Sequence, residues 1–420
     1  MTQTSHPPRA DNTPSPGSGR GLAARVSLGR LFTPPSTEFI LIASTATLLT
    51  LFGLVMVFSA TSADPVTPFD AAMKQGVFAL IGIPLMLLVS RLPVKFLGRI
   101  AWPALIAATA LQLLIFVPGL RVSSDGNTNW IKIAGFQMQP SEFLKLALVL
   151  WIAFVLLRKQ ARLGIWHHVF IPVVPISILV IGTVIGGHDL GTAMVLVLIV
   201  LGCLFFSGVK LRLFILPLLA GIVGVLFYAL SSENRMTRIL SALNPSACDI
   251  TDECYQPAHA VWGMANGGVF GVGLGNSQEK YGWLPAAAND YIFAIVGEEL
   301  GLIGCLLVLA LFGAFSVGAF HIIRKTDDPF IRVATGGIVV WVIGQALINI
   351  GVVLRVFPVM GVPLPFMSQG GTALLSVLMA CGVLLAFART MPVPGQAAPR
   401  RSGAGRAAAG RRPAERGRVA

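Results

Sequence analysis

The chain of 420 residues is strongly apolar and carries a formal net charge of +13. Charged residues make up only 12% of it, against roughly 25% in a typical soluble domain, and the mean hydropathy is +0.78. This composition excludes an ordinary soluble enzyme and indicates a polytopic membrane protein, whose basic residues report topology rather than nucleic-acid binding. The first apolar run, 39–59, is long enough to span and stay, so we expect no cleaved signal peptide.

Ten apolar runs, each close to the roughly 20 residues that cross a bilayer as a helix, follow one another along the chain. They cover residues 38–60, 70–90, 100–118, 140–157, 168–186, 190–207, 211–230, 291–320, 331–353 and 366–388. The tails outside them, 1–35 and 391–420, lack apolar periodicity, which predicts disorder. The sequence therefore predicts an all-α polytopic membrane protein with one ten-helix domain at 36–390. A large loop, 231–290, joins its seventh and eighth helices. Only Gly187 to Asp189 separates the fifth from the sixth, which predicts a tight hairpin.

The distribution of basic residues sets the predicted orientation, because segments rich in Lys and Arg stay in the cytoplasm. With both termini placed in the cytoplasm, 23 of the 31 Lys and Arg residues fall in cytoplasmic segments. Of the other eight, seven are assigned to outer segments and only Lys145 to the interior of a span. We therefore expect a multi-pass protein of the cytoplasmic membrane with two cytoplasmic tails, and with loop 231–290 on the outer face.

The segment 275–301 is informative because a polar loop runs there into an apolar helix. Asp290 lies at the junction, where a half-buried carboxylate with a raised pKa would serve as a general base. The alternative is that Asn289 or Asp290 caps the next helix, since both residue types are good N-caps. The local sequence leaves both interpretations open.

A second polar segment, 119–145, ends with Glu142 and Lys145 after Pro140, which suits a first helical turn. Side chains three residues apart share a helix face, and a lysine inside a span is costly unless it pairs or faces a polar cavity. Two interpretations stay open here: an ion pair that locks the helix, or a basic group directed at an anionic ligand.

Three further features belong to the predicted outer face. Cys248 and Cys254 share one polar loop, which predicts a disulfide if that loop faces an oxidising exterior. The glycines at 267–275 permit close approach of the backbone, either to a ligand or to neighbouring chain. Prolines and glycines break the helical pattern at 355–371, which predicts a re-entrant segment beside a site, since freed backbone groups need burial or a cavity.

Six basic side chains lie on the same predicted outer face as Asp290. They are Arg121, Lys132, Arg235, Arg238, Lys280 and Arg355. Such a cluster around one carboxylate suits a pyrophosphate substrate attacked by a hydroxyl, because arginine binds phosphate oxygens and the carboxylate takes the proton. No metal-ligand spacing is evident, although a divalent cation would suit the same phosphates.

A series of motifs, taken in chain order, resembles the SEDS family, the shape, elongation, division and sporulation glycosyltransferases. They are Trp130-Ile131; Gln139-Pro-Ser-Glu142 with Lys145; Asp189-Leu-Gly-Thr192; Arg238-Ile239 with Asn244-Pro245; Tyr255-Gln256; Gly267 to Gly275; Leu284-Pro285 with Asn289-Asp290 and Phe293; Glu298-Glu299-Leu-Gly301; and Gly361-Val-Pro-Leu-Pro365 with Ser368. The resemblance covers about residues 38–390. Ala288-Asn289 and His259-Ala260 depart from the family pattern, which concerns contacts around the site rather than the reaction.

The resemblance implies an activity, partners and residue roles. Members polymerise lipid II, an undecaprenyl-pyrophosphate-linked disaccharide pentapeptide, on the outer face of the membrane, together with a class B penicillin-binding protein transpeptidase. Asp290 matches their catalytic carboxylate, and no cofactor is certain. The implied substrate contacts are Lys145, Glu142, Arg238, Arg121, Trp130, Gln256, Lys280, Glu298, Arg355 and Ser368.

The long tails and the segment Arg355-Val-Phe-Pro-Val-Met-Gly361 resemble those of division-type members. This resemblance implies synthesis at the septum, beside other divisome proteins. An elongation-type polymerase, a lipid II flippase and a scaffold for the transpeptidase stay open as alternatives. A transporter would place charged groups near the midplane of the membrane, whereas the charges here lie mostly at the predicted outer edge. A scaffold would not need Asp290.

Overall fold

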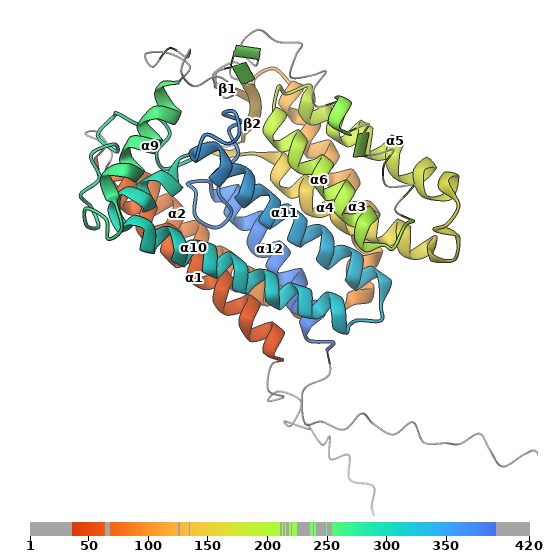
Figure 1. The fold of residues 1–420 in the computed structure, drawn as a ribbon. Coiled ribbons are helices and arrows are strands. Elements are labelled where there is room, and N and C mark those ends of the chain that lie inside the picture. The colour runs from red at the N-terminus through yellow and green to blue at the C-terminus, as the bar shows by residue number, and fades with distance from the viewer. Residues whose placement is uncertain are drawn as a thin grey trace, which may run out of the picture. The chain divides into compact units, whose positions relative to one another are not determined.

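The computed structural model describes residues 36–63, 68–124, 127–133, 135–210 and 254–391, with isolated residues and short stretches between 212 and 249. Eight helices in these ranges are long and apolar enough to cross a membrane, and α6 is a shorter apolar helix (Figure 1). The prediction of a helical polytopic membrane protein is therefore confirmed. The predicted span 211–230 and both predicted tails fall mostly or wholly outside the described residues.

The helices follow the predicted apolar runs, except that the predicted start of the third span at 100 is wrong, because α3 begins at Val94. They are α1 (Thr37–Thr61), α2 (Asp70–Val89), α3 (Val94–Leu113), α4 (Pro140–Arg158), α5 (Trp166–Ile185), α6 (Leu190–Phe206), α9 (Tyr255–Gly267), α10 (Ile292–Lys325), α11 (Pro329–Val353) and α12 (Gly371–Ala388). Short 3-10 helices follow α3 and α4, at Leu114–Phe116 and Gln160–Arg162. The tight α5–α6 hairpin is confirmed, with His188 at φ 67° in its turn.

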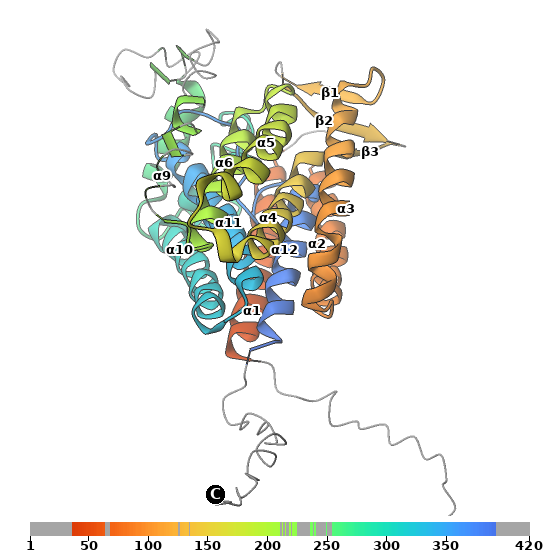
Figure 2. The same cartoon turned by 90° about the vertical axis from the view of Figure 1, so that its right-hand side faces the viewer.

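Burial separates an inner group of helices from an outer one. Most side chains of α4, α11 and α12 are buried inside the bundle, whereas in the other long apolar helices fewer than half are buried. The inner helices pack against the outer ones, α12 against α1 and α2, and α11 against α6 and α10. Figure 2 shows α4 and α12 in the middle of the bundle, with α3 and α10 at its sides. This is the arrangement expected of a membrane bundle, whose outer helices present apolar side chains to lipid.

A three-stranded antiparallel sheet, which the sequence did not predict, occupies the segment between α3 and α4. It consists of β1 (Arg121–Ser124), β2 (Asn127–Ile133) and β3 (Phe136–Met138), with β2 in the centre. The backbone N–H of Thr128 donates to the carbonyl of Gly187, at 2.9 Å, so the sheet is joined to the α5–α6 turn. Strands this short carry too little alternation to be recognised from a single sequence.

The predicted loop 231–290 is not a loop throughout, because it contains α9. The chain after α9 packs against α10 where that helix breaks, at Gly301 (φ 66°, ψ −162°). The N–H groups of Val272 and Gly273 donate to the carbonyls of Glu298 and Glu299, each at 3.0 Å. A Cβ on Gly301 would lie 2.4 Å from the backbone nitrogen of Gly271. The glycines thus serve chain packing, as one of the two interpretations predicted.

The segment 354–370 is non-helical, as predicted for the Pro- and Gly-rich stretch. The prediction that the last span begins at 366 is wrong, because α12 begins at Gly371 and Phe366 has a φ of 66°. Side chains from two helices hold this segment. The Gln75 amide of α2 donates to the carbonyl of Ser368 at 3.1 Å and accepts from the N–H of Gly370 at 3.1 Å. Buried side chains thereby replace the backbone partners that a helix would supply.

Candidate active site

Asp290 lies in a tight turn immediately before α10. Its N–H donates to the carbonyl of Ala286 at 3.1 Å, and Ala286 has a φ of 56°. The N-cap of α10 is Tyr291, and no side chain caps this helix. The alternative interpretation that Asn289 or Asp290 caps the helix is therefore wrong, and the Asp290 carboxylate is left free for another role.

The electrostatic surroundings of Asp290 favour its neutral form. Burial, and next to it the charge of Asp189, raise the pKa of Asp290 from 3.8 to about 6. Asp189 itself caps α6, accepting from the N–H of Thr192 at 2.8 Å and from the Gln139 amide at 3.2 Å. Burial raises the pKa of Asp189 despite the bond from Thr192. In the described part of the chain, no ion pair involves Asp290. Its carboxylate is therefore a proton acceptor with a near-neutral pKa.

The segment 354–370 forms one wall beside Asp290. A Cβ added to Gly361, which has a φ of 65°, would lie 3.8 Å from Oδ2 of Asp290. A Cβ added to Gly191, just after Asp189, would lie 2.5 Å from the carbonyl oxygen of Met360. The chain at 360–361 therefore contacts both carboxylate-bearing turns, and glycine at 361 keeps side-chain atoms away from the Asp290 carboxylate.

The backbone of Asp290 is fixed by a second helix. Asn349 of α11 donates through Nδ2 to the carbonyl of Asp290 at 2.7 Å and to that of Val362 at 2.8 Å. The N–H of Gln369 donates to the carbonyl of Ala288 at 2.8 Å. The turn at 286–290 and the segment 354–370 are thus joined at two points.

Lys145 and Glu142 form the buried ion pair that one of the two interpretations predicted. Their Nζ and Oε2 atoms are 2.8 Å apart, and Lys145 is 1% exposed. Lys145 also donates to Oε1 of Gln345 at 2.9 Å and lies over the ring of Trp341. Ser376 donates to Glu142 at 3.3 Å. Direct contact of Lys145 with a substrate stays a prediction.

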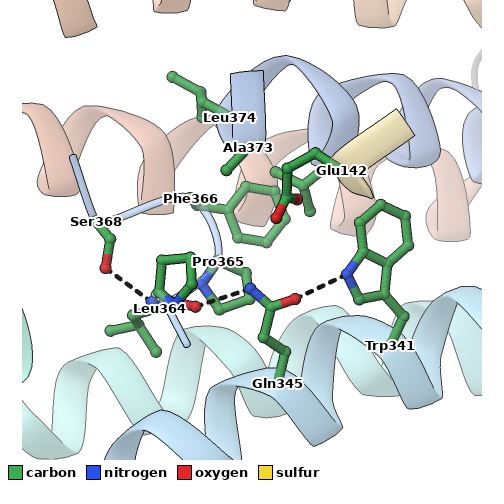
Figure 3. Close-up of a pocket in the computed structure, with 11 residues that line it drawn as sticks. Glu142, Trp341, Gln345, Leu364, Pro365, Phe366, Ser368, Ala373 and Leu374 are labelled. Carbon is green, nitrogen blue, oxygen red and sulfur yellow. Dashed lines mark hydrogen bonds between the residues drawn. The ribbon is translucent and has the colours of Figure 1, made fainter. Parts of the chain in front are cut away.

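Gln345 carries this network on to the segment 354–370. Its Oε1 accepts from Nε1 of Trp341 at 2.9 Å, and its Nε2 donates to the carbonyl of Pro363 at 2.8 Å (Figure 3). Ser368, a predicted substrate contact, accepts from the N–H of Leu364 at 2.7 Å. The cavity among these residues has room for about one water molecule. Asp290 does not line it, and it is far too small to hold a sugar, so contact of Glu142 and Ser368 with a substrate stays a prediction.

Lys280 and Glu298 lie in a separate buried network that joins the loop 275–280 to α10. Lys280 donates to the carbonyl of Gly275 at 2.6 Å and pairs with Glu299 at 3.4 Å. Glu298 accepts from the N–H of Gln278 at 2.9 Å. Neither side chain makes a hydrogen bond or ion pair with Asp290, so the structure places both in the anchoring of the loop 275–280. Their contact with substrate stays a prediction.

The remaining predicted site residues are spread over three elements. Arg121 and Trp130 lie on β1 and β2, and Gln256 lies in the first turn of α9. Arg355, at φ 61°, donates through Nη2 to Sγ of Cys254 at 3.1 Å. Arg235 and Arg238 lie outside the described residues, so convergence of the predicted basic cluster stays a prediction.

Cys254 is disulfide-bonded, whereas Cys203, Cys305 and Cys381 are free and buried. Cys248 lies outside the described residues, so its pairing with Cys254 stays a prediction. Within the ranges that the structure describes, no three His, Cys, Asp or Glu side chains are grouped closely enough to hold a metal ion. A divalent cation that enters with substrate phosphates stays a prediction.

Sequence reasoning missed Asp189, Gln345 and Asn349 as parts of the site. The two amides lie four residues apart in an otherwise apolar run, and polar side chains in a span are costly unless they have a purpose. The sequence therefore contained a signal for both amides. The proximity of Asp189 to Asp290 had no local signal, because it arises from helix packing.

Comparison with known families gives a match over almost the whole described domain. The family model FtsW/RodA/SpoVE, described as "Cell cycle protein", matches residues 39–391. The chain is 37% identical over 394 residues to the "Probable peptidoglycan glycosyltransferase FtsW" of Mycobacterium tuberculosis, covering 93% of this chain and 74% of that protein. It is 35% identical over 360 residues to "Stage V sporulation protein E" of Bacillus subtilis, covering 84% and 97%.

Solved structures show the same fold. One, titled "Structural coordination of polymerization and crosslinking by a peptidoglycan synthase complex", matches with a TM-score of 0.69 at 22% identity, over 85% of this chain and 98% of that chain. The rod shape determining protein RodA of Thermus thermophilus matches with a TM-score of 0.62 at 23% identity, over 86% and 98%. The chain belongs to the FtsW/RodA/SpoVE family of cell cycle proteins, the SEDS family that its motifs resemble.

Proposed function

We propose that the chain is a peptidoglycan glycosyltransferase that polymerises lipid II into glycan strands at the outer face of the cytoplasmic membrane. The observation that carries this proposal is Asp290, a carboxylate with a pKa of about 6 and no ion-pair partner in the described part of the chain. A general base is most effective when its pKa lies near the working pH. The printed name of the relative from Mycobacterium tuberculosis supports the same reaction.

In the proposed reaction, Asp290 takes the proton from the 4-hydroxyl of the acceptor's N-acetylglucosamine. The resulting oxygen attacks the anomeric carbon of the donor's muramyl sugar. A glycosidic C–O bond forms while the C–O bond to the pyrophosphate breaks, so undecaprenyl pyrophosphate leaves with the electron pair and the anomeric configuration inverts. One base suffices for this displacement, and Asp189 is already engaged with Thr192 and Gln139.

The leaving pyrophosphate needs positive charge around it. Lys145 and Arg238 are the first candidates for this role. Because Lys145 is buried against Glu142, we propose that its charge acts at a distance, while Arg238 makes direct contact. A divalent cation bound with the pyrophosphate would share the task. The other proposed substrate contacts are Glu142, Arg121, Trp130, Gln256, Lys280, Glu298, Arg355 and Ser368.

The proposed setting is the division septum, with both termini in the cytoplasm. The excess of Lys and Arg in the segments assigned to the cytoplasm supports this orientation. Relatives named FtsW support the division subtype, and the solved peptidoglycan synthase complex supports a class B penicillin-binding protein as partner. Other divisome proteins are proposed to join the assembly.

The experiment that tests the function measures glycan polymerisation from lipid II by the purified chain with its class B partner, wild type against Asp290→Asn. The substitution keeps the size of the side chain but removes the proton acceptor. We expect a rate at least about 10²-fold lower, the scale that general base catalysis contributes. Co-purification of the partner and the thermal unfolding temperature serve as controls for assembly and folding.

Each outcome separates the proposal from its alternatives. Polymerisation by Asp290→Asn at the wild-type rate would remove Asp290 from the chemistry. If neither protein polymerises lipid II while the partner still binds, a flippase or a scaffold explains the fold better. Transfer of labelled lipid II across vesicles that contain the chain would then distinguish those two.

A further inference from the structure

Asn349 is a fully buried amide that bridges two separate parts of the chain. It is 1% exposed, and its Nδ2 donates at 2.7 Å to the carbonyl of Asp290 and at 2.8 Å to that of Val362. Its Oδ1 is buried without a partner in the described part of the chain. The orientation of this amide is therefore set by the two carbonyls, since the flipped amide would place oxygen against both.

The two bridged carbonyls need this donor. Asp290 and Val362 both lie in non-helical chain, and no other described group donates to either carbonyl. Leaving a buried carbonyl without a partner costs roughly 1–3 kcal/mol. An apolar residue at 349 would leave both unpaired, so the turn before α10 would move to regain a partner.

The segment that contains Val362, on the other side of the bridge, is held by further hydrogen bonds to helices. One turn earlier on α11, Gln345 holds the carbonyl of Pro363, and its Oε1 is itself held by Trp341 and Lys145. From α2, Gln75 holds Ser368 and Gly370. Three buried side-chain amides therefore fix the segment 362–370 to helices, and among these three only Asn349 also reaches the catalytic turn.

We propose that Asn349 is a positioning residue for Asp290: it holds the backbone of Asp290 against Val362, and so holds the carboxylate beside Asp189 and Gly361. This inference rests on the proposed function, in which Asp290 is the base. Asn349 does not touch the substrate in this role. Asn349 determines the position of the Asp290 carboxylate, which is the proton acceptor.

Two kinetic consequences follow from the geometry. A displacement of about 1 Å at a reacting group can cost 10²-fold in rate, so kcat falls while KM changes little. A turn that is released also exposes the carboxylate to water and moves it from Asp189, so the pKa of Asp290 falls from about 6 toward its ordinary value. The acid limb of the pH–rate profile then moves to lower pH. Glu142 and Lys145 of α4 are the other charged groups that act on Asp189.

The experiment compares Asn349→Leu and Asn349→Ala with wild type. Leucine has the same number of side-chain heavy atoms as asparagine but no donor, and alanine serves if leucine fails to fold. Thr335→Val is the matched control, because Thr335 is a fully buried polar residue of the same helix whose Oγ1 has no partner in the described part of the chain. Lipid II polymerisation is followed with the class B partner over a range of pH, and unfolding temperature is recorded for each variant.

The expected result is a kcat about 10²-fold lower with KM nearly unchanged and the acid limb shifted to lower pH, while Thr335→Val behaves as wild type. A folded Asn349 variant with the wild-type kcat and the wild-type acid limb overturns the inference. A lower kcat with an unmoved acid limb also overturns it, since general loosening of the fold would do that. Wild-type activity in Asp290→Asn would instead overturn the proposed function.

Discussion

Asp290 destabilises the fold in its ionised form, and its raised pKa makes this measurable. The pKa is about 6 in the folded protein against 3.8 ordinarily, so the folded state holds a proton more tightly than the unfolded chain. The contribution of Asp290 to stability is therefore fully present below about pH 4, and it is lost as the pH rises through about 6. We predict that Asp290→Asn raises the free energy of unfolding at neutral pH by on the order of 1–3 kcal/mol.

Thermal unfolding of both proteins in detergent, at about pH 5 and about pH 7.5, checks this expectation through the sign of the linkage. The advantage of Asp290→Asn must be larger at the higher pH. An equal advantage at both values would show that burial does not disfavour the charge of Asp290.

Lys145 and Glu142 are predicted to be strongly coupled. Removing one partner of a buried ion pair leaves an uncompensated charge, which costs about 3–5 kcal/mol, whereas removing both is often close to neutral. We expect Lys145→Met to unfold at a much lower temperature than wild type and the double variant Lys145→Met/Glu142→Gln to recover part of the loss. Unfolding temperatures of the four proteins form the cycle, and additive losses would contradict the coupling.

Single residues were predictable from sequence where their signal was local. Glu142 and Lys145 are three apart on one helix, and Asp290 stands at a polar–apolar junction, so both features were readable. The position of Asp189 beside Asp290 depends on how α6 and α10 pack around the segment 354–370, and no short pattern encodes that. Asn349 lay between these cases, as a polar residue in an apolar run whose partners were unknown.

At the scale of the element, Gly301 is predicted to be irreplaceable within α10. Its φ of 66° is strained for other residues, and a Cβ there would lie 2.4 Å from the nitrogen of Gly271 and 2.5 Å from the carbonyl oxygen of Val269. We expect Gly301→Ala to abolish folded expression or to lower the unfolding temperature severely. Gly313→Ala in the same helix meets no atom within 4 Å and should stabilise, by up to about 1 kcal/mol.

Fluorescence-detected size exclusion of the two tagged variants, before and after heating, makes the comparison. A Gly301→Ala protein as stable as Gly313→Ala would show that the break in α10 is not required. The break itself could not be predicted, because the run 291–320 is long and, apart from Glu298 and Glu299, apolar, which favours one continuous helix.

The boundaries of elements were predicted well where the length and hydropathy of a run determine them. They were predicted poorly where contacts with neighbouring segments determine them. The membrane helices begin and end near the predicted positions because a bilayer demands about 20 apolar residues. The start of α12 was misplaced by five residues, because Phe366 and its neighbours are apolar yet belong to the non-helical segment. The short strands between α3 and α4 pair with one another, and one hydrogen bond joins them to the α5–α6 turn, which lies far away in sequence.

For the whole molecule, the orientation in the membrane is the main testable expectation. With the termini in the cytoplasm, the exposed side chain of Gln278 lies outside and Ser402 lies inside. We expect a membrane-impermeant maleimide to label Gln278→Cys in intact cells and Ser402→Cys only after lysis. Labelling in the reverse order would invert the predicted topology, and unsubstituted protein controls for its native cysteines.

The class and extent of the membrane domain could be predicted from the sequence, since composition, span length and charge asymmetry each depend on the bilayer rather than on tertiary contacts. What the sequence left open was the end of the bundle where Asp290 lies. There the helix N-termini, the sheet and the segment 354–370 meet through single side chains such as Gln75 and Gln345, and such contacts require coordinates.

The join between the chain after α9 and the break in α10 is made by main-chain atoms. Along residues 268–273 it is formed by the N–H groups of Val272, Gly273, Leu302 and Ile303 and the carbonyls they reach, while side-chain contacts with α10, such as that of Lys280 with Glu299, lie outside this stretch. Most positions along it can therefore exchange their side chains over evolutionary time without loosening it. The glycines are the exceptions: Gly271 and Gly301 each leave space that the opposing backbone fills, and Gly268 and Gly273 have positive φ angles. Divergent sequences can thus keep the connection just upstream of α10 intact while the surface that covers it changes freely.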